Sequence, residues 1–308
     1  MMTLSFAEAS RKGIQTVTEL SAIAAPIRLY AIVLRMVVIR PGAVPTDHGG
    51  QARACLLDLI RRADKTLSAQ WHDTNIHKPY TISLLQPLEH TQRGADGALH
   101  CGEGDRLDWR FSLQCEPGFE AVLKRFLLSR ALPHLRVGTL EFAITDVFAS
   151  NSGHFASGYT TPAALLERYD CPPATLDRAI ELHFTAPTVF HLGRDAETGI
   201  SRYCTLPQPR LLFSTLRKKW ASLGGYEPGD VFDSWVERAV NAESYRLNTT
   251  TVVVDKRHLH GFSGFVRFRL QAEPQWWPLV HLLADLAFWT GVGYQTTRGM
   301  GQVRRIVE

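Results

Sequence analysis

Two histidines and a lysine in the first quarter of the chain have the types and spacing for acid–base chemistry on a phosphodiester. His72 ends a predicted helical segment that begins at Asp64, and Lys78 follows six residues later. A histidine at a helix end can exchange a proton near neutral pH, and a nearby lysine can hold a phosphoryl group as a point charge. The pair therefore suits cleavage of RNA by its own 2′-hydroxyl: a base takes the proton, a cation stabilises the phosphorane, and an acid protonates the leaving 5′-oxygen.

His48, at the start of the preceding predicted helix, is the second choice for the base. A structural role is the alternative for either histidine, since histidines often pack in cores or neutralise helix C-terminal ends. A metal site is not indicated. His72 and His77 flank an aspartate without an evident third ligand, and the His-Leu-His run from residue 258 has no evident partner. We expect neither a metal nor another cofactor.

A glycine-rich stretch near the C-terminus lies between an apolar helical run and a short strand. It contains Gly291, Gly293, Gly299 and Gly301 and is flanked by Arg298, Arg304 and Arg305. Glycine tolerates positive φ and lets another backbone approach closely, so the cluster predicts a shaped loop rather than a slack linker. Unpaired N–H groups and arginines in such a loop would cradle phosphate oxygens. A glycine-rich connection packed between a helix and an edge strand is the alternative.

The second half of the chain carries the expected surface for a polyanion. Five basic residues and no acid lie between Ser201 and Lys219. From Lys256 to the end there are seven Lys or Arg and three acidic residues. Alternation places Arg267 and Arg269 on one face of a predicted strand. These two arginines and four further cations are candidates to follow a ribose-phosphate backbone, and an ordinary solvated sheet face is the alternative. The four are Lys218, Lys219, Lys256 and Arg257.

Composition is that of a globular protein, with 45% hydrophobic and 21% charged residues and a net charge of +4. The five cysteines are odd in number and far apart, so neither a disulfide framework nor a zinc site is implied. We find no apolar run long enough to cross a bilayer and no secretory signal, and expect a cytoplasmic protein without membrane contact.

The predicted elements occur twice in the order strand, helix, strand, strand, helix, strand. In the first unit we expect strands over 29–39, 79–85, 107–114 and 135–148, with helices from Thr46 or Asp47 to 63 and over 117–132. The second unit has strands over 180–190, 249–254, 264–271 and 300–307, with helices over 209–223, 231–240 and 274–290. Two βαββαβ copies predict an α+β protein of two tandem ferredoxin-like, RRM-like units with a C-terminal glycine-rich loop.

The expected organisation has four parts. Residues 1–25 form an N-terminal extension to which no role is assigned, and residues 26–150 form the first ferredoxin-like domain, which carries the candidate catalytic histidine. A polar stretch over 151–176 is the expected linker. Residues 177–308 form the second domain, with the glycine-rich loop and the RNA-binding face.

Taken together, these segments resemble the CRISPR-associated endoribonucleases that cut precursor CRISPR RNA, a branch of the repeat-associated mysterious protein superfamily. The most specific carriers are the glycine loop and the run Asp64-Lys-Thr-Leu-Ser-Ala-Gln-Trp-His72 leading to Lys78-Pro-Tyr-Thr81. The strand Leu182-His-Phe-Thr-Ala-Pro-Thr-Val-Phe190 and the segment Leu206-Pro-Gln-Pro-Arg-Leu-Leu-Phe213, with Trp220 beyond it, also match.

The resemblance implies a tandem ferredoxin-like fold that binds repeat RNA and cuts it without metal, leaving a 2′,3′-cyclic phosphate and a 5′-hydroxyl. It places the catalytic histidine at His72 and a supporting lysine at Lys78. Some members add a tyrosine on the first helix, where this chain has Leu57. That departure gives His72 and Lys78 more of the work, or passes part of it to another group such as His48.

We therefore expect a metal-independent endoribonuclease that acts on CRISPR repeat RNA in precursor crRNA. Other subunits of a CRISPR effector complex and a second copy of the chain are further expected partners. One alternative is a non-catalytic subunit that binds guide RNA in such a complex. Another is a general RNA-binding protein that stacks bases on aromatic side chains of its sheets.

Overall fold

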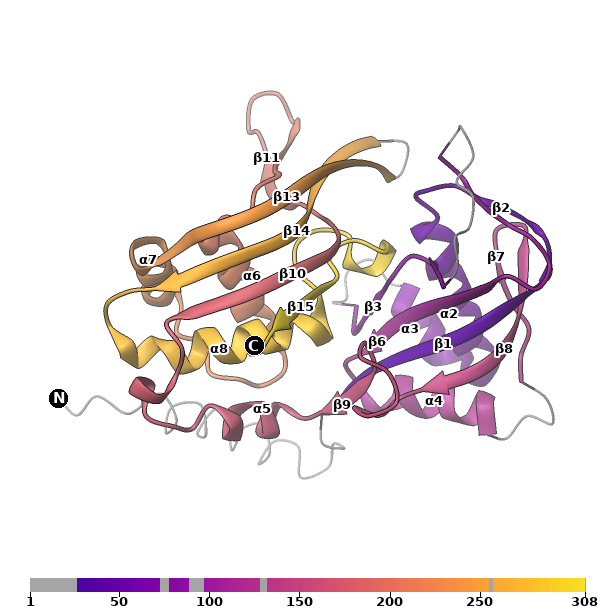
Figure 1. The fold of residues 1–308 in the computed structure, drawn as a ribbon, viewed down its shortest axis with the longest axis horizontal. Coiled ribbons are helices and arrows are strands. Elements are labelled where there is room, and N and C mark those ends of the chain that lie inside the picture. Colours follow the sequence, from indigo (N-terminus) through magenta and orange to yellow (C-terminus); the bar gives the residue numbers. More distant parts are fainter. Residues whose placement is uncertain (1–26, 73–77, 89–96, 128–131, 255–256, 308) are drawn as a thin grey trace.

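The chain folds into two α+β units that lie side by side, each with a sheet in front of its helices in the view of Figure 1. The computed structural model describes residues 27–72, 78–88, 97–127, 132–254 and 257–307. The expectations for residues 1–25 and for Lys256 lie outside these ranges. None of the described helices is long and apolar enough to span a membrane.

The N-terminal unit has the expected split βαββαβ order. Its main sheet runs β3-β6-β1-β8-β7, and the neighbouring strands are antiparallel. The shorter strands β2 and β5 pair with each other, and β4 extends the contact with β6. In chain order the elements are β1 (Leu29–Arg40), β2 (Gly42–Val44), α2 (Gly49–Ala63), α3 (Lys65–His72), β3 (Tyr80–Ile82), β4 (Gln86–Pro87), β5 (Leu99–Cys101), β6 (Arg106–Leu113), α4 (Glu116–Leu127), β7 (Leu135–Val137) and β8 (Leu140–Phe148).

Three local details refine the expected elements. The strand expected over 135–148 is a hairpin, because Gly138 turns the chain with φ 61°. Neither Thr46 nor Asp47 caps α2; the N-cap is His48, and the Thr46 hydroxyl donates to the carbonyl of Gly97 instead. The expected start of a helical segment at Asp64 is confirmed, since the Asp64 carboxylate accepts from the Leu67 N–H at 2.9 Å, as a helix cap does.

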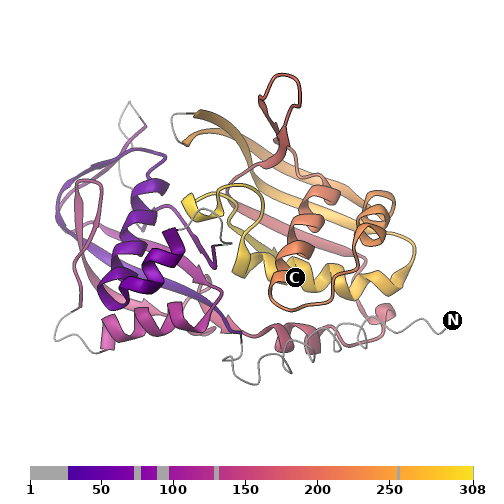
Figure 2. The same ribbon diagram turned by 180° about the vertical axis from the view of Figure 1, so that it is seen from behind.

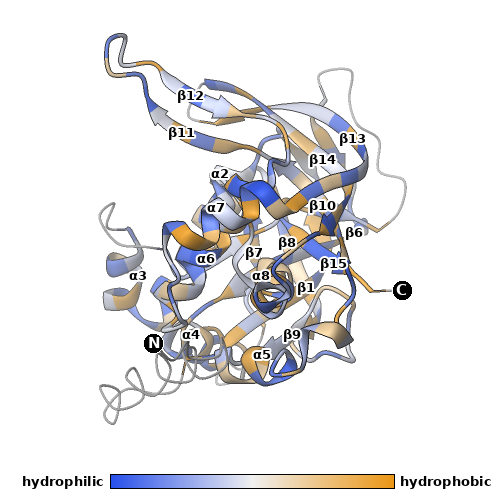
Figure 3. Cartoon of the chain, turned by 90° about the vertical axis from the view of Figure 1, so that its left-hand side faces the viewer, coloured by the Kyte–Doolittle hydropathy of each residue, from blue (hydrophilic) through white to orange (hydrophobic). Residues whose placement is uncertain are grey.

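The C-terminal unit repeats this order in a four-stranded antiparallel sheet, β13-β14-β10-β15. The hairpin β11–β12, which the sequence reading missed, projects from this unit at the top of Figure 3. The elements are β10 (Ala179–Thr188), β11 (Phe190–Arg194), β12 (Ser201–Cys204), α6 (Pro209–Ser222), α7 (Asp230–Ala239), β13 (Val240–Val254), β14 (Arg257–Leu270), η2 (Pro274–Trp276), α8 (Trp277–Thr290), η3 (Thr296–Arg298) and β15 (Val303–Ile306).

Each unit buries its own core, and the segment between them packs against both. Strand β9 (Gly158–Thr160) pairs with the start of β1, and α5 (Pro162–Arg168) is followed by η1 (Pro173–Thr175). Leu165 and Leu166 of α5 belong to the same core as Leu29 of β1 and the residues of α8. The stretch expected as a linker is therefore docked along the second unit (Figure 2).

A buried arginine of β6, Arg110, joins the two units because it binds the C-terminal end of α8. The Arg110 guanidinium on β6 donates to Phe288 O at 2.6 Å, to Ala156 O at 2.9 Å and to Gln302 Oε1 at 2.5 Å. Gln302 in turn donates to Ile82 O on β3 at 2.8 Å. Burial lowers the pKa of Arg110 to about 10, so the side chain is still charged at neutral pH. A cation there also opposes the negative end of the helix dipole.

Further side chains satisfy the last carbonyls of α8, which have no partner within the helix. Ser112 Oγ on β6 donates to Trp289 O at 2.6 Å. The Lys219 ammonium on α6 donates to Thr290 O at 2.6 Å and to Gly291 O at 2.9 Å, and burial lowers its pKa to about 7. The helix end is thus capped by strands and helices of both units.

A second polar network holds β15 and α5 against α8. Arg305 donates to Tyr169 Oη at 2.7 Å, and Nη2 of Arg305 lies 2.8 Å from His281 Nδ1. His281 Nε2 lies 2.9 Å from Asp177 O, and the Tyr169 hydroxyl donates to Asp285 at 2.6 Å. Arginine and the carbonyl together fix His281 as the neutral Nε2–H tautomer. Burial, assisted by the charge of Arg305, lowers its pKa to about 4.

Replacing Arg110 with glutamine tests the joint between the units. We expect the free energy of unfolding to fall by roughly 3 kcal/mol, because three acceptors at the joint lose their donor. Urea unfolding measures this loss. The control is Arg106→Gln, at an exposed position on the same strand. Equal losses in the two variants would show that Arg110 does not join the units.

The low pKa of His281 predicts a loss of stability in acid. The unfolded chain takes up the proton at an ordinary histidine pKa of 6.5 and the folded chain only at about 4. The stability that neutral His281 contributes is therefore complete above pH 6.5. As the pH falls to 4, the free energy of unfolding decreases by roughly 2–3 kcal/mol. His281→Gln, compared by urea unfolding at pH 7 and pH 4.5, should lose this step, whereas the exposed His258→Gln should keep it.

Candidate functional site

His72 is the last residue of α3 and its side chain is exposed. The residue before it, Trp71, is buried and stacks on Tyr80 of β3 with ring centroids 5.0 Å apart. Gly118 of α4 leaves room for that indole: a Cβ there would lie 2.7 Å from the Trp71 ring. The core therefore fixes the helix end and presents His72 to solvent.

Lys78 lies two residues before β3 and is half-buried. Strand β3 is held by β6, with Tyr80 opposite Leu113. The residues between His72 and Lys78 lie outside the described part of the chain. The two candidate catalytic side chains thus stand at the two ends of one short connection, each attached to an element packed in the core.

His48, the second choice for the base, has a structural role. It is 4% exposed. Its Nδ1 lies 2.7 Å from Pro45 O, and its Nε2 accepts from the Leu85 N–H at 2.8 Å. These contacts define a neutral Nδ1–H tautomer with both ring nitrogens in use. The side chain ties the start of α2 to the segment after β3 and has no nitrogen to offer a substrate.

Sequence reasoning missed a cation beside β3. Arg53 of α2 donates from Nε to the Tyr80 hydroxyl at 3.1 Å. Burial raises the pKa of Tyr80, and the positive charges of Arg53 and Arg298 act in the opposite direction. Arg53 lies one helical turn before Leu57, which is buried at the position where the family resemblance expected a tyrosine. The sequence could have indicated Arg53, because residues four apart on a helix lie on the same face, and Arg53 precedes Leu57 by four.

All four glycines of the C-terminal loop have positive φ, between 62° and 87°. A Cβ on Gly293 would lie 2.5 Å from Val189 O, and one on Gly301 would lie 2.0 Å from Val292 O. The expected shaped loop is present for this reason. Many of its N–H groups are already bonded, however, to carbonyls of the loop or its neighbours, so a fully open phosphate cradle is not formed. Such donors include the amides of Gly291, Val292, Tyr294, Arg298 and Gly301.

The loop is wedged between the units. The Arg298 carbonyl of the loop lies so close to α2 that a Cβ on Gly49 would be 1.8 Å from its oxygen. A Cβ on Gly299 would likewise lie 2.5 Å from the Leu84 side chain. A cavity of about 200 Å³ lies beside this contact, lined by Arg298, Asp47 and the end of β13, among others. The glycines thus bring Arg298 to the N-terminal end of α2, near Tyr80.

The other predicted RNA-binding cations separate into distinct groups. Arg267 is paired with Glu181 and Glu243, at 3.6 and 3.4 Å, and Arg269 with Glu243 at 2.7 Å, so acids offset both. Lys219 is used at the end of α8, as described above. Lys218 and Arg257 are exposed. Arg304 is half-buried on β15, with its guanidinium 5.1 Å from the Phe155 ring.

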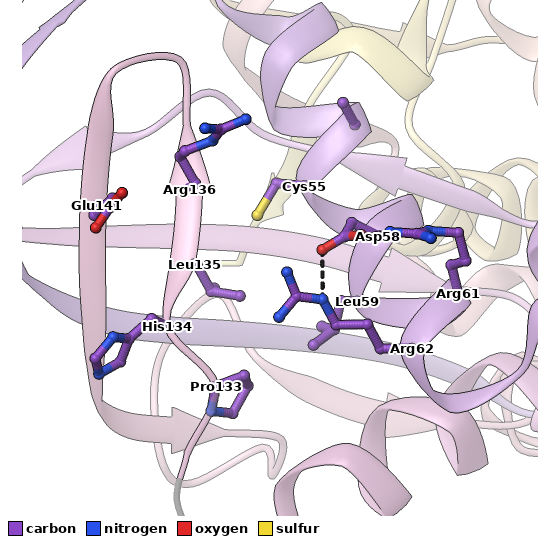
Figure 4. A pocket seen from close by; sticks show the side chains of 11 residues that line it. Cys55, Asp58, Leu59, Arg61, Arg62, Pro133, His134, Leu135, Arg136 and Glu141 are labelled. Atoms are coloured by element: carbon purple, nitrogen blue, oxygen red, sulfur yellow. Dashed lines mark hydrogen bonds and ion pairs between the residues drawn. The ribbon is translucent and has the colours of Figure 1, made fainter.

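A larger cavity of about 640 Å³ lies elsewhere, between α2 and the β7–β8 hairpin (Figure 4). Its two carboxylates are already paired, Asp58 with Arg62 at 2.7 Å and Glu141 with Arg40 at 2.7 Å. At its base, burial raises the pKa of the Cys55 thiol to about 12, so no thiolate is available as a nucleophile. We do not assign the candidate active site to this cavity.

The fold and the loop together define the class: a protein of two ferredoxin-like units with a glycine-rich loop wedged between them. Within that class, the model of the family "CRISPR-associated endoribonuclease Cas6" matches residues 182–303. The expected resemblance to this family is confirmed, in sequence mainly for the second unit.

Relatives and solved structures agree with this match. A Cas6 endoribonuclease of Streptococcus thermophilus is 24% identical over 151 residues, which are 46% of this chain and 62% of that protein. The chain thus spans less than two thirds of that relative. A Cas6 product complex superposes with a TM-score of 0.70 and 25% identity, over 90% of this chain and 100% of the other. Thermus thermophilus Cas6 gives a TM-score of 0.68 at 23% identity, over 92% and 100% of the chains, and supports the fold.

The contact between Gly49 and the glycine loop predicts opposite effects for two adjacent substitutions. Gly49→Ala should lower the free energy of unfolding by roughly 1–3 kcal/mol, because its methyl group displaces the loop backbone at Arg298. Gly50→Ala meets nothing within 4 Å and should be neutral or stabilising, by up to about 1 kcal/mol. Urea unfolding compares the two, and equal effects would contradict the wedge.

Proposed function

We propose that this protein is a metal-independent endoribonuclease that binds CRISPR repeat RNA and cuts precursor crRNA within the repeat. The 2′-hydroxyl next to the cut attacks its own phosphate, which gives a 2′,3′-cyclic phosphate and a 5′-hydroxyl. The observation that carries the proposal is the exposed His72, held at the end of α3 by the buried Trp71, within a Cas6-like fold.

His72 acts as the general base or acid. Its imidazole is exposed at a helix end, where an RNA backbone has access to it. The buried Trp71 anchors the backbone from which the ring projects, and proton transfer in a transition state requires a defined position. Since both nitrogens of His48 are in use, His72 is the better assignment.

Cations at the same end of the first unit supply the charge. Lys78 stabilises the phosphorane, and Arg53 and Arg298 add positive charge beside Tyr80. The glycine loop holds Arg298 in place through the close contact with Gly49. This cluster makes up for the leucine at position 57.

Repeat RNA is the partner that the comparisons favour. The chain superposes on a Cas6 product complex, and a further structure of similar fold is titled as a repeat-associated mysterious protein that binds different RNA substrates. Three of the predicted cations lie at or near the surface, and no described acid pairs with them: Lys218, Arg257 and Arg304.

Cleavage of a labelled repeat RNA in EDTA tests this function. The wild type should cut it, and His72→Ala should cut roughly 10²–10⁴ times more slowly because proton transfer is lost. Lys78→Ala should also slow the reaction. The matched controls are Gln70→Ala, on the exposed side of the same helix, and Lys65→Ala, which removes an exposed charge.

A substrate with a 2′-deoxy nucleotide at the cut separates the chemistry from binding. The wild type should bind it as tightly as the RNA but leave it whole. Cutting of the deoxy substrate would refute attack by the 2′-hydroxyl. If the wild type binds the repeat and cuts it in no buffer, the protein is a guide-RNA-binding subunit rather than an enzyme.

A further inference from the structure

Successive carbonyls at the C-terminal end of α8 take their donors from different units. The carbonyls of residues 288 and 289 accept from side chains of β6 in the first unit. Those of Thr290 and Gly291 accept instead from Lys219 Nζ on α6 of the second unit, at 2.6 and 2.9 Å. The first pair of carbonyls joins the units, whereas the second pair lies where the helix ends and the glycine loop begins. Lys219 therefore acts on the start of the loop rather than on the joint.

Lys219 reaches this position from a helix that the core holds in place. Its neighbours Leu216 and Trp220 are fully buried, whereas Lys219 is half-buried as a residue. Burial lowers the pKa of its amine to about 7. The charged and the neutral amine both carry at least two N–H groups, so the nitrogen can serve both carbonyls on either side of that pKa. When charged, it also opposes the negative end of the helix dipole.

Gly291 is the residue at which the chain turns out of the helix. Its φ of 62° and ψ of 179° form a combination that is open essentially only to glycine. One residue later the two arms of the loop are tied together, because the Val292 N–H donates to Gly301 O at 2.9 Å. The Gly301 N–H in turn donates to Pro187 O at 3.0 Å. The direction set at residue 291 is thus passed to both arms of the loop.

Arg298 lies at the far end of the same loop, against the first unit. Its carbonyl forms the close contact with Gly49, and its positive charge acts on Tyr80. Figure 2 shows the loop extending from the end of α8 toward the first unit. Since the contact with Gly49 leaves no room for even a Cβ, a change in the direction of the loop would alter where Arg298 meets α2.

We propose that Lys219 is a positioning residue for RNA cleavage. By holding the Thr290 and Gly291 carbonyls, it sets the direction in which the glycine loop leaves α8, and so the place of Arg298 in the cleavage site. The inference rests on the proposed function, in which Arg298 supplies positive charge. A displacement of about 1 Å, caused far from the reacting atoms, can slow a reaction by about 10²-fold. A lysine of the second unit can in this way control a reaction on the first.

Single-turnover cleavage of a labelled repeat RNA in EDTA, at saturating enzyme, tests this dependence. Lys219→Met removes the donor and keeps an unbranched apolar chain. It should cut roughly 10- to 100-fold more slowly, with an affinity for the RNA that changes by less than about threefold. In an Arg298→Ala background the same substitution should change the rate by less than about twofold, because the group through which Lys219 acts is gone. Arg210→Met, which removes an exposed cation from the same helix, is the matched control and should cut at the wild-type rate.

Hydrogen exchange of the free protein follows the loop directly and needs no cleavage. In Lys219→Met the amides of Tyr294 and Gly301, which are bonded to carbonyls beside β10, should exchange at least about tenfold faster. The Gln114 amide, which donates to Pro79 O in the first unit, should keep its rate. An equal increase at all three amides would mean that the substitution destabilises the whole chain, and would contradict a specific effect on the loop.

The two measurements separate this inference from the proposed function. If the wild type cuts the repeat and Lys219→Met cuts it equally fast, or if the losses multiply in the double variant, the proposal is overturned and the cleavage function stands. If the wild type cuts no repeat RNA but the loop amides still exchange faster, Lys219 positions the loop and the cleavage function falls. Should Lys219→Met not fold, Lys219→Arg replaces it, because it keeps a charged donor at the helix end but displaces it, and the same results are expected.

Discussion

The arrangement of the two units depends on how the C-terminal end of α8 is satisfied. That end is buried, so its free carbonyls need donors that water cannot supply. Arg110 and Ser112 of β6 provide them from the first unit, and Lys219 from the second. Because a donor from each unit meets the same helix end, the relative position of the two sheets is fixed by hydrogen bonds rather than by apolar packing alone. The docked connection that contains Ala156 is held by the same guanidinium.

This joint also decides where the glycine loop can lie. The loop begins at the capped end of α8 and must return to β15 within a few residues, next to α2 and β3. Only residues without a Cβ allow the backbone contacts at Gly49, Gly293 and Gly301. The loop therefore carries Arg298 to the first unit, close to Tyr80 and Arg53. In the proposed function, the cleavage site on one unit would therefore include a side chain of the other.

Much of the fold was predictable from the sequence, and the misses have local physical causes. The periodicity of Leu56, Leu59 and Ile60 gives α2 directly, and the alternation of Val266, Phe268 and Leu270 gives β14. The β11–β12 hairpin was missed because it has little apolar periodicity; it packs through the ring contacts of His191 and Tyr203 with Tyr294 of the glycine loop. The β7–β8 turn was missed because one glycine, Gly138, makes it.

The sequence by itself determined the element order, the tandem ferredoxin-like class, the glycine positions and the placement of His72 at a helix end, since each follows from residues close together in the chain. Only the tertiary structure decided which polar groups are free to bind. Lys219 is used by carbonyls about 71 residues away, His48 by an amide 37 residues away, and Arg267 by acids on two other strands. Arg304 lies beside the Phe155 ring, and no acid in the described part of the chain pairs with it. A charge or a ring can be read from the chain, but its partners are set by contacts between distant segments.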